Sequence, residues 1–475
     1  RAPPEIRLEA EVSVQGRVIA RANGPSAEPL RIDVPDPHPW SPSDPFLYDL
    51  EVRLVRGPVV EDRVRSYFGM RTVQVGKDER GVPRLLLNGA PLFQMGVLDQ
   101  GFWPDGIYTA PSDEALRSDI ELVKRLGFNM IRKHVKVEPE RWYAWCDRLG
   151  VIVWQDMPSG FLEGADGKTV EPGPLERAQF RDELGRLIET RRNHPSIAMW
   201  VVFNEGWGQH QTPELVQLVK ALDRKRLVSN ASGWTDESCG DVIDVHVYPG
   251  PGAPKPTSQN EEKRAAVLGE FGGLGLGVSG HTWKTDTWGY RGTADAEELT
   301  TGYVNLLRNV HDLRENAGLC AAVYTQLTDV ETECNGLVTY DRAVVKVDAA
   351  RTRDANEGRV PKLAVVVPTS QAEGIAWRYR FDPPEANGSE QGLDDSSWKE
   401  GPGGFGTEGT PGAIVRTEWK TPEIWLRRHF DLDTDPDATL SLLVHHDEDV
   451  EVFLNGVLAA KAAGYTTGYE PLAIR

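Results

Sequence analysis

The sequence IAMWVVFNE at residues 197–205 decides the fold, because an unbroken apolar run ends there in two polar residues. A continuous apolar run of this length is typical of a strand that is buried on both faces of a parallel sheet. The same kind of run recurs along the middle of the chain. The further runs lie at residues 92–99, 128–134, 150–157, 226–232, 242–248, 265–273 and 320–328.

Amphipathic helical stretches separate most of these runs. In residues 112–127 the apolar side chains recur at helical spacing, from Leu116 to Leu126. Residues 139–150 and 177–193 are also predicted to be helices. Strands that alternate with helices predict βα units, and eight strands in about 245 residues match the size of a (β/α)8 TIM barrel.

Strand and turn signals dominate on both sides of this region. The first 75 residues alternate apolar and polar positions between Pro-rich turns, which is typical of a β-sandwich. Late in the chain the helical period disappears, and Asn455-Gly456 is a strong hairpin signal. We therefore predict three domains, namely a partial β-sandwich at 1–76, a TIM-barrel catalytic domain at 77–355 and a second β-sandwich at 356–475.

Composition excludes several classes of partner. The chain has 475 residues, with 53 Lys and Arg against 72 Asp and Glu and a net charge of −19. An acidic surface argues against a nucleic-acid or anionic-membrane partner. No apolar run reaches the roughly 18 residues that a membrane-spanning helix needs. The four cysteines lack metal-ligand spacing, so we predict free thiols and no metal, with a Cys320–Cys334 disulfide as the alternative.

Polar residues follow most of the predicted strands, at the barrel end where the loops carry the chemistry. Glu205 and Glu270 stand out, because a carboxylate is rarely placed at the end of a buried strand without a partner or a task. A structural salt bridge with Arg132 or Lys133 is the alternative explanation. The other candidate substrate-binding residues are Asp99, Arg132, His134, Asp156, Asn204, Trp207, His246, Tyr248, Trp283 and Gln326.

Two carboxylates at one barrel rim suit glycoside hydrolysis. One acid protonates the leaving oxygen, and a second group attacks the anomeric carbon or activates water. Arg132 is expected to lower the pKa of the attacking carboxylate, and Tyr248 is expected to hydrogen-bond it. Asp99 and Asp156 either bind outer sugar hydroxyls or cap the helices that follow them.

Tryptophan is the unusual feature of the composition, with 14 residues. Flat indole rings stack on sugars, although core packing in β-sandwiches is the alternative for many of them. We expect five tryptophans to lie on the rim loops of the barrel. They are Trp103, Trp154, Trp207, Trp283 and Trp288.

Several motifs in fixed order resemble glycoside hydrolase family 2. The sequence RNHPSIAMWVVFNEGWG at 192–208 resembles the acid/base signature of that family, which implies Glu205 as the proton donor. The sequence VLGEFGG at 267–273 resembles its nucleophile strand, which implies Glu270. The segments that resemble the passage into the barrel, its second and third strands and its exit are residues 67–97, 127–158 and 324–342.

The resemblance implies a retaining exo-β-glycosidase that needs no cofactor. It implies an immunoglobulin-like first sandwich, a galactose-binding-like jelly-roll at the end, and contact of Asn204 with the sugar 2-hydroxyl. β-Galactosides are the first expectation for the substrate, and β-glucuronides and β-mannosides are the alternatives. A glucuronide would need a basic partner such as Lys284 or Arg291. A non-catalytic carbohydrate-binding scaffold is the alternative of another class.

Family members carry a further sugar-binding domain before the first sandwich, and this chain begins without Met. We therefore expect it to be part of a larger enzyme. Enzymes of this type are often exported, which favours a periplasmic or extracellular location. The expected partner is a glycoside or oligosaccharide, and a homo-oligomer stays open.

Overall fold

The computed structural model describes residues 6–163, 169–255, 263–360, 365–384, 388–410, 413–432, 440–466 and 468–474. The chain divides into two compact units, Arg1–Val360 and Pro361–Arg475. Within the described ranges, no helix combines the length and the apolar character that crossing a membrane requires. All four cysteines are free thiols, as predicted.

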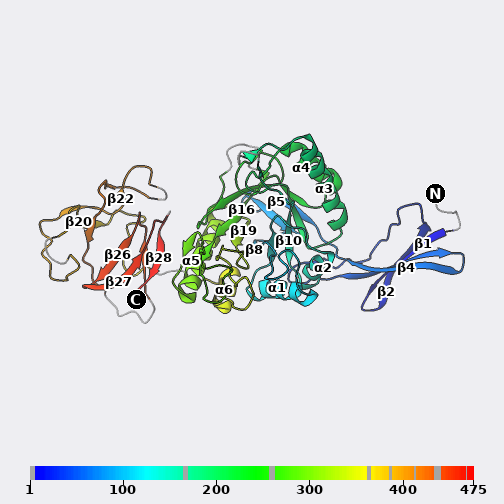
Figure 1. Cartoon of the computed structure of the whole chain (residues 1–475), viewed down its shortest axis with the longest axis horizontal. Coiled ribbons are helices and arrows are strands. Elements are labelled where there is room, and N and C mark those ends of the chain that lie inside the picture. The colour runs from blue at the N-terminus through cyan, green and yellow to red at the C-terminus, as the bar shows by residue number, and fades with distance from the viewer. Residues whose placement is uncertain are drawn as a thin grey trace. The chain divides into compact units, whose positions relative to one another are not determined.

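The first unit contains an eight-stranded sheet in which every neighbouring pair is parallel (Figure 1). Its order is β14-β13-β10-β9-β8-β19-β16-β15, so its two edge strands are consecutive in the chain and the sheet nearly closes. Each of the eight predicted runs contains one of these strands, which confirms the barrel. The strands are β8 (Gln94–Asp99), β9 (Met130–Lys133), β10 (Ile152–Asp156), β13 (Ile197–Val201), β14 (Leu227–Ser229), β15 (Val242–Val247), β16 (Ala265–Gly272) and β19 (Ala321–Thr325).

Helices connect several of the barrel strands and lie outside them (Figure 1). The first helix begins after the N-cap residue Ser112, whose side chain accepts a hydrogen bond from the Ala115 backbone N–H at 3.2 Å. The three helices predicted from periodicity are α1, α2 and α3. The described helices are α1 (Asp113–Arg125), α2 (Glu140–Leu149), α3 (Pro174–Arg191), α4 (Thr212–Leu222), α5 (Ala296–Asn316) and α6 (Ala349–Asn356).

Two apolar clusters cover the two faces of the barrel sheet. Ile120 of α1 belongs to the cluster between helices and strands, together with Val153 and Trp200. Because successive side chains of a strand point to opposite faces, the neighbouring residues Trp154 and Met199 belong to the cluster inside the barrel. The expectation that Trp154 lies on a rim loop is therefore wrong: it is a fully buried residue of β10.

A small antiparallel sheet contributes to the same interior cluster. Leu85 is buried within the cluster, and Val75 packs against it. The interior of the barrel is therefore filled with apolar side chains. Its polar candidate residues lie at the carboxyl ends of the strands. The sheet consists of β5 (Val73–Lys77), β6 (Pro83–Leu87) and β7 (Ala90–Pro91).

Antiparallel strands dominate before the barrel and in the second unit, as the sequence predicts. The first four strands form one sheet in the order β2-β1-β3-β4, and Asn455-Gly456 joins β26 to β27 as a hairpin. The jelly-roll order of the second unit and the three domain boundaries stay predictions. The first four strands are β1 (Ile6–Val14), β2 (Arg17–Pro25), β3 (Tyr48–Arg56) and β4 (Val59–Phe68). The second unit contains β20 (Ala376–Arg380), β21 (Lys399–Pro402), β22 (Phe405–Gly406), β23 (Thr417–Glu418), β24 (Trp425–Arg427), β25 (Ser441–Val444), β26 (Val450–Leu454), β27 (Val457–Ala462) and β28 (Glu470–Ala473). Short strands in the barrel loops are β11 (Leu162–Glu163), β12 (Thr169–Val170), β17 (Leu274–Gly275) and β18 (Arg291–Gly292).

Replacing Trp154 tests the packing inside the barrel. The indole of Trp154 is fully buried and donates a hydrogen bond to Gln94 Oε1 at 2.7 Å. We expect Trp154→Ala to lower the free energy of unfolding by about 3–5 kcal/mol, because it leaves a cavity and an unpaired amide. Urea unfolding followed by circular dichroism measures the loss. Trp283→Ala is the control, since Trp283 is 41% exposed, and an equal loss in both variants would contradict this account.

Candidate active site

The two predicted glutamates lie at the carboxyl ends of β13 and β16, and the local backbone explains their orientation. The Glu205 N–H donates to the Ser232 carbonyl at 2.8 Å, and Glu205 has a φ of 51°, in the left-handed region that non-glycine residues rarely adopt. Strand β16 pairs irregularly with both neighbours beside Gly269. Such a bulge re-aims the next side chain, here that of Glu270.

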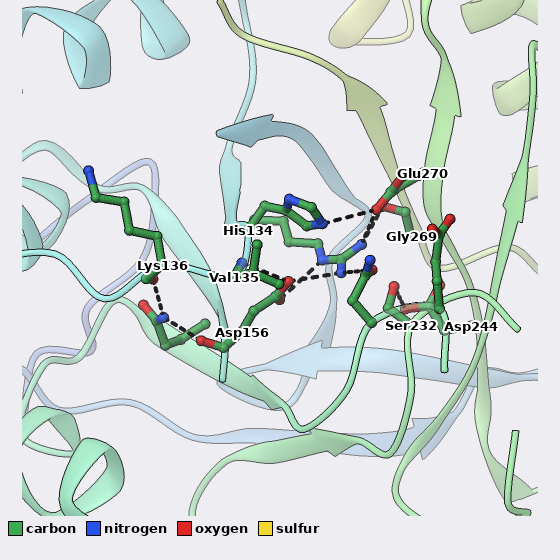
Figure 2. A network of polar contacts seen from close by, with 12 residues as sticks. His134, Val135, Lys136, Asp156, Ser232, Asp244, Gly269 and Glu270 are labelled. Atoms are coloured by element: carbon green, nitrogen blue, oxygen red, sulfur yellow. Dashed lines mark hydrogen bonds and ion pairs between the residues drawn. The ribbon is translucent and has the colours of Figure 1, made fainter. Parts of the chain in front are cut away.

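Residue 269 must be glycine, because the space beside its Cα is already filled by other side chains. A Cβ atom at this position would lie 2.2 Å from Asp244 Oδ1 and 2.4 Å from Ser232 Oγ. Figure 2 shows Ser232 and Asp244 beside Gly269 and Glu270. The absence of a side chain at residue 269 thus lets Glu270 and this polar pair share one site.

Arg132 of β9 is the centre of the polar network. Its guanidinium is fully buried and donates from Nε and Nη2 to the two Asp156 carboxylate oxygens at 3.1 and 2.9 Å. Nη2 also donates to Asn204 Oδ1 at 2.7 Å, and Nη1 donates to Glu270 Oε1 at 3.0 Å. One cation therefore fixes side chains from three parts of the barrel. Figure 2 shows two of them, Asp156 and Glu270, in this network. The predicted ion pair between Arg132 and a glutamate is present, and it involves Glu270.

Glu270 is held as a carboxylate by its surroundings. Tyr248 donates its phenolic proton to Glu270 Oε2 at 2.5 Å, and His134 Nε2 lies 3.6 Å from Oε1. Burial by itself would raise the pKa of Glu270, but the charges of His246 and Arg132, with smaller contributions from His134 and the Tyr248 hydrogen bond, lower it to about 2. Glu270 is therefore ionised at neutral pH.

Glu205 faces Glu270 through His246. His246 Nδ1 lies 2.8 Å from Glu205 Oε1, and its Nε2 lies 2.8 Å from Ser232 Oγ. Burial lowers the pKa of His246, but the charge of Glu270 and the hydrogen bond to Glu205 outweigh burial and raise it. One oxygen of Glu205, one of Glu270 and a ring nitrogen of His246 all lie within 4.8 Å of one another. This trio is the only group in the described chain whose ligand atoms could hold a metal ion.

Two predicted substrate-binding residues carry buried polar atoms without a hydrogen-bond partner. They are Asn204, whose Nδ2 has none, and His134, whose two ring nitrogens have none. A buried polar atom without a partner is costly, so these atoms are available for a ligand. Trp207 lies edge-on to His134, with ring centroids 6.0 Å apart, and the Phe161 ring lies tilted to Trp207 with centroids 5.7 Å apart.

Other predicted residues are engaged by protein partners. Asp99 accepts from Lys133 Nζ at 2.5 Å, and Lys133 also bonds Glu138 at 2.9 Å. Burial opposes the ionisation of Asp99, but the charge of Lys133 outweighs it and lowers the Asp99 pKa. Gln326 is fully buried and donates to Asn335 Oδ1 at 2.9 Å. Asp156 is taken up by Arg132. The side chains of Asp99, Asp156 and Gln326 are therefore bonded within the protein.

The predicted rim tryptophans divide by exposure. Trp283 and Trp288 are 41% and 48% exposed, whereas Trp103 is buried. Trp288 lies edge-on to Tyr290, and the Tyr290 ring stacks on Tyr248 with centroids 3.7 Å apart. An aromatic wall, Trp288–Tyr290–Tyr248, thus runs to Glu270.

Sequence reasoning missed several residues of this site. Tyr290, Glu333 and the Ser232–Asp244 pair carry no local motif that singles them out. Burial raises the pKa of Asp244 to about 6, against the charges of His246 and Arg132. The requirement for glycine at residue 269, which adjoins the Ser232–Asp244 pair, becomes visible only once the neighbouring strands are in place.

A parallel barrel whose carboxyl-end rim holds two facing glutamates has the architecture of the barrel glycosidases. Comparison with known families agrees. Residues 84–264 match the model for the TIM barrel domain of glycosyl hydrolases family 2, and residues 5–71 match a second model for glycosyl hydrolases family 2. The two matches together span just over half of the chain. The chain belongs to glycosyl hydrolase family 2.

Individual relatives are distant. A beta-galactosidase of Psychromonas ingrahamii is 30% identical over 223 residues, which cover 45% of this chain and 20% of that protein. A GH2 beta-galacturonidase of Eisenbergiella tayi bound to galacturonate has a TM-score of 0.56 at 20% identity, covering 74% of this chain and 67% of that one. A beta-glucuronidase of Ruminococcus gnavus has a TM-score of 0.59 at 19% identity, covering 74% and 64%. The structural likeness shows a shared fold, and the chain spans about a fifth to a quarter of the curated relatives it matches, from 20% to 25%.

The lowered pKa of Glu270 makes a prediction about stability. A carboxyl whose pKa is lower in the folded chain stabilises the fold above its unfolded pKa, and this stabilisation is lost as the pH falls toward the folded pKa of about 2. We expect the stability advantage of the wild type over Glu270→Gln to shrink by about 1 kcal/mol between pH 6 and pH 4. Urea unfolding at both pH values measures it. Glu331→Gln, at an exposed position, is the control, and a difference between the wild type and Glu270→Gln that stays constant with pH would contradict the assignment.

Proposed function

We propose that this protein is a retaining exo-β-glycosidase that releases terminal β-linked sugars, with β-galactosides as the preferred substrates. The observation that carries the proposal is the approach of Glu205 and Glu270, which have carboxylate oxygens within 4.8 Å of each other. Retaining glycosidases hold their two carboxyl groups about 5–5.5 Å apart, whereas inverting enzymes hold them about 6.5–9.5 Å apart. The short separation favours double displacement.

In this mechanism Glu270 is the nucleophile. Its ionised carboxylate attacks the anomeric carbon and forms a glycosyl ester, while Glu205 gives its proton to the leaving glycosidic oxygen. Glu205 then takes a proton from water, whose oxygen attacks the same carbon and releases Glu270 as a carboxylate. Arg132 and Tyr248 hold Glu270 ionised and oriented, and the contact of 2.8 Å between His246 and Glu205 keeps a proton beside the acid/base.

Asn204 and His134 are proposed to bind the sugar that reacts. Asn204 Oδ1 is held by Arg132, so its buried Nδ2 points a free donor into the site, as contact with the sugar 2-hydroxyl requires. His134 offers two further ring nitrogens without a hydrogen-bond partner, and its Nε2 lies 3.6 Å from Glu270 Oε1. Trp207 with Phe161 is proposed to stack on the leaving group, because Trp207 follows Glu205 by two residues.

The identity of the sugar rests on the relatives. Several of the sequence relatives are beta-galactosidases, among them those of Psychromonas ingrahamii and Lactococcus lactis, which favours a β-galactoside. A β-glucuronide or a β-mannoside is the second candidate within the family. No cofactor enters the mechanism, and we propose a neutral glycoside or oligosaccharide as the partner.

A panel of aryl β-glycosides tests the proposal. We expect release from the galactoside to exceed that from the glucoside, glucuronide, mannoside and arabinoside. Glu270→Ala and Glu205→Ala should lower kcat/KM at least about 1,000-fold, because each removes a group that acts only in the transition state. Equal background release from the wild type and Glu270→Ala would favour a non-catalytic carbohydrate-binding scaffold instead.

Azide distinguishes the roles of the two glutamates. With Glu270→Ala, azide occupies the space of the lost nucleophile and should give the α-glycosyl azide. With Glu205→Ala and an activated aryl glycoside, azide attacks the glycosyl-enzyme and should give the β-glycosyl azide. Proton nuclear magnetic resonance identifies the anomers, and the reverse pattern would exchange the two assignments.

Tyr248→Phe tests how Glu270 is oriented. The change removes only the phenolic donor at 2.5 Å and keeps the stacking on Tyr290. We expect kcat to fall about 10- to 100-fold with KM nearly unchanged, since the bond positions the nucleophile rather than the sugar. Tyr465→Phe, an exposed tyrosine of the second unit, is the control. An unchanged kcat in Tyr248→Phe would remove Tyr248 from the mechanism.

A further inference from the structure

A third carboxyl group, that of Glu333, lies in the loop after β19 and is fixed by its backbone and side chain. The Glu333 N–H donates to the Val330 carbonyl at 2.9 Å, and the Val330 N–H donates to the Glu333 carbonyl at 3.1 Å. Its side chain accepts from Asn335 Nδ2 at 2.8 Å. The Asn335 Oδ1 in turn accepts from Gln326, which accepts from Gln100 at 2.9 Å. The carboxyl of Glu333 is therefore held in one place.

This place adjoins the aromatic wall that leads to Glu270. Trp288 and Glu333 are paired through their backbones, and Tyr290 lies edge-on to Trp288. A Cβ atom on Gly273 would lie 2.4 Å from the Tyr290 ring and 3.3 Å from Asn335 Nδ2. The Tyr290 ring and the amide that holds Glu333 thus meet at Gly273, three residues after Glu270.

Electrostatics agrees with this placement. Burial raises the pKa of Glu333 to about 7, against its hydrogen bond from Asn335, and the charge of Glu270 raises it further. Burial also raises the pKa of Tyr290 to about 12, with contributions from Glu333, Glu270 and Glu205. All three carboxyl groups therefore act on the phenol of Tyr290.

Two basic side chains of β9, those of Arg132 and Lys133, are already engaged by protein partners. Arg132 is fully buried, and each of its three nitrogens donates to a protein acceptor. Lys133 is almost completely buried between Asp99 and Glu138. A negatively charged sugar would meet Glu270 and Glu333 without gaining either cation.

We propose that Glu333 is a specificity residue of the sugar subsite, which selects neutral glycosides over glycosides of uronic acids. The inference rests on the proposed function. As a neutral acid Glu333 donates a hydrogen bond to a sugar hydroxyl, and as a carboxylate it accepts one. As a carboxylate it repels the like charge of a uronate, whereas a sugar hydroxyl can donate to it, so the ionised form of Glu333 selects the neutral glycoside.

Matched substrates that differ only at carbon 6 test the inference. Aryl β-galactoside is compared with aryl β-galacturonide, and aryl β-glucoside with aryl β-glucuronide, using the full chain. We expect the wild type to favour the neutral member of each pair by at least about 100-fold in kcat/KM. Glu333→Lys should lower neutral turnover and raise uronide turnover, narrowing the ratio at least about tenfold, and Glu333→Gln should narrow it less. Glu331→Lys, at an exposed position in the same loop, should leave the ratio unchanged.

Binding of galactose and galacturonate to the wild type and to Glu333→Lys, measured by calorimetry, provides a readout that does not need turnover. If Glu333→Lys binds galacturonate more tightly relative to galactose than the wild type does, the inference is supported. If no aryl glycoside is cleaved, only the proposed function is overturned. Equal loss on both members of each pair would show a merely structural role and overturn the inference. A wild-type preference for uronides would overturn it too, while leaving the retaining glycosidase intact.

Discussion

The buried guanidinium of Arg132 is the interaction on which the site depends. It joins Asp156 at the end of β10, Asn204 after β13 and Glu270 in β16, and each of these contacts is a hydrogen bond to a buried partner. A charge in such a place is tolerated only because its partners neutralise it and saturate its donors. The same contacts hold Glu270 ionised and turn Asn204 so that its amide nitrogen is free. The hydrogen bonds of Arg132 therefore both stabilise the buried charge and orient the candidate catalytic side chains.

The backbone supplies the second constraint. Glu205 lies in the left-handed region, and Glu270 follows a bulge at Gly269 where any side chain would collide with Asp244 and Ser232. A strained backbone persists only where neighbouring structure holds it in place. Here Glu205 bonds Ser232, and β16 is paired with β15 and β19 on its two sides. This arrangement brings oxygens of the two carboxyl groups to within 4.8 Å of each other. His246 contacts both, with Nδ1 2.8 Å from Glu205 Oε1 and 3.5 Å from Glu270 Oε2.

The sequence predicted the barrel well because its signal is local. The buried strands lie in apolar runs, α1 has a clear helical period, and all eight strands lie in the predicted runs. The two glutamates were equally visible, since a carboxylate at the end of such a run is conspicuous. Trp154 was misplaced although it lies within the predicted strand run at 150–157. Only the strand register shows that it points into the barrel.

The sequence by itself determined which residue types reach the rim, since the order of strands fixes which polar residues end them. Only the tertiary structure decided which of these side chains are available to a substrate and which are bonded to other residues of the protein. Three other polar residues lie at or just after strand ends, as Glu205 does, but their side chains are already bonded within the protein. Asp99 bonds Lys133, Asp156 bonds Arg132 and Gln326 bonds Asn335. Glu333 lies in the loop after β19, and Tyr290 lies between β17 and β18. The physical reason is that the pairing of a buried charge depends on neighbours far away in the chain, and no local pattern encodes them.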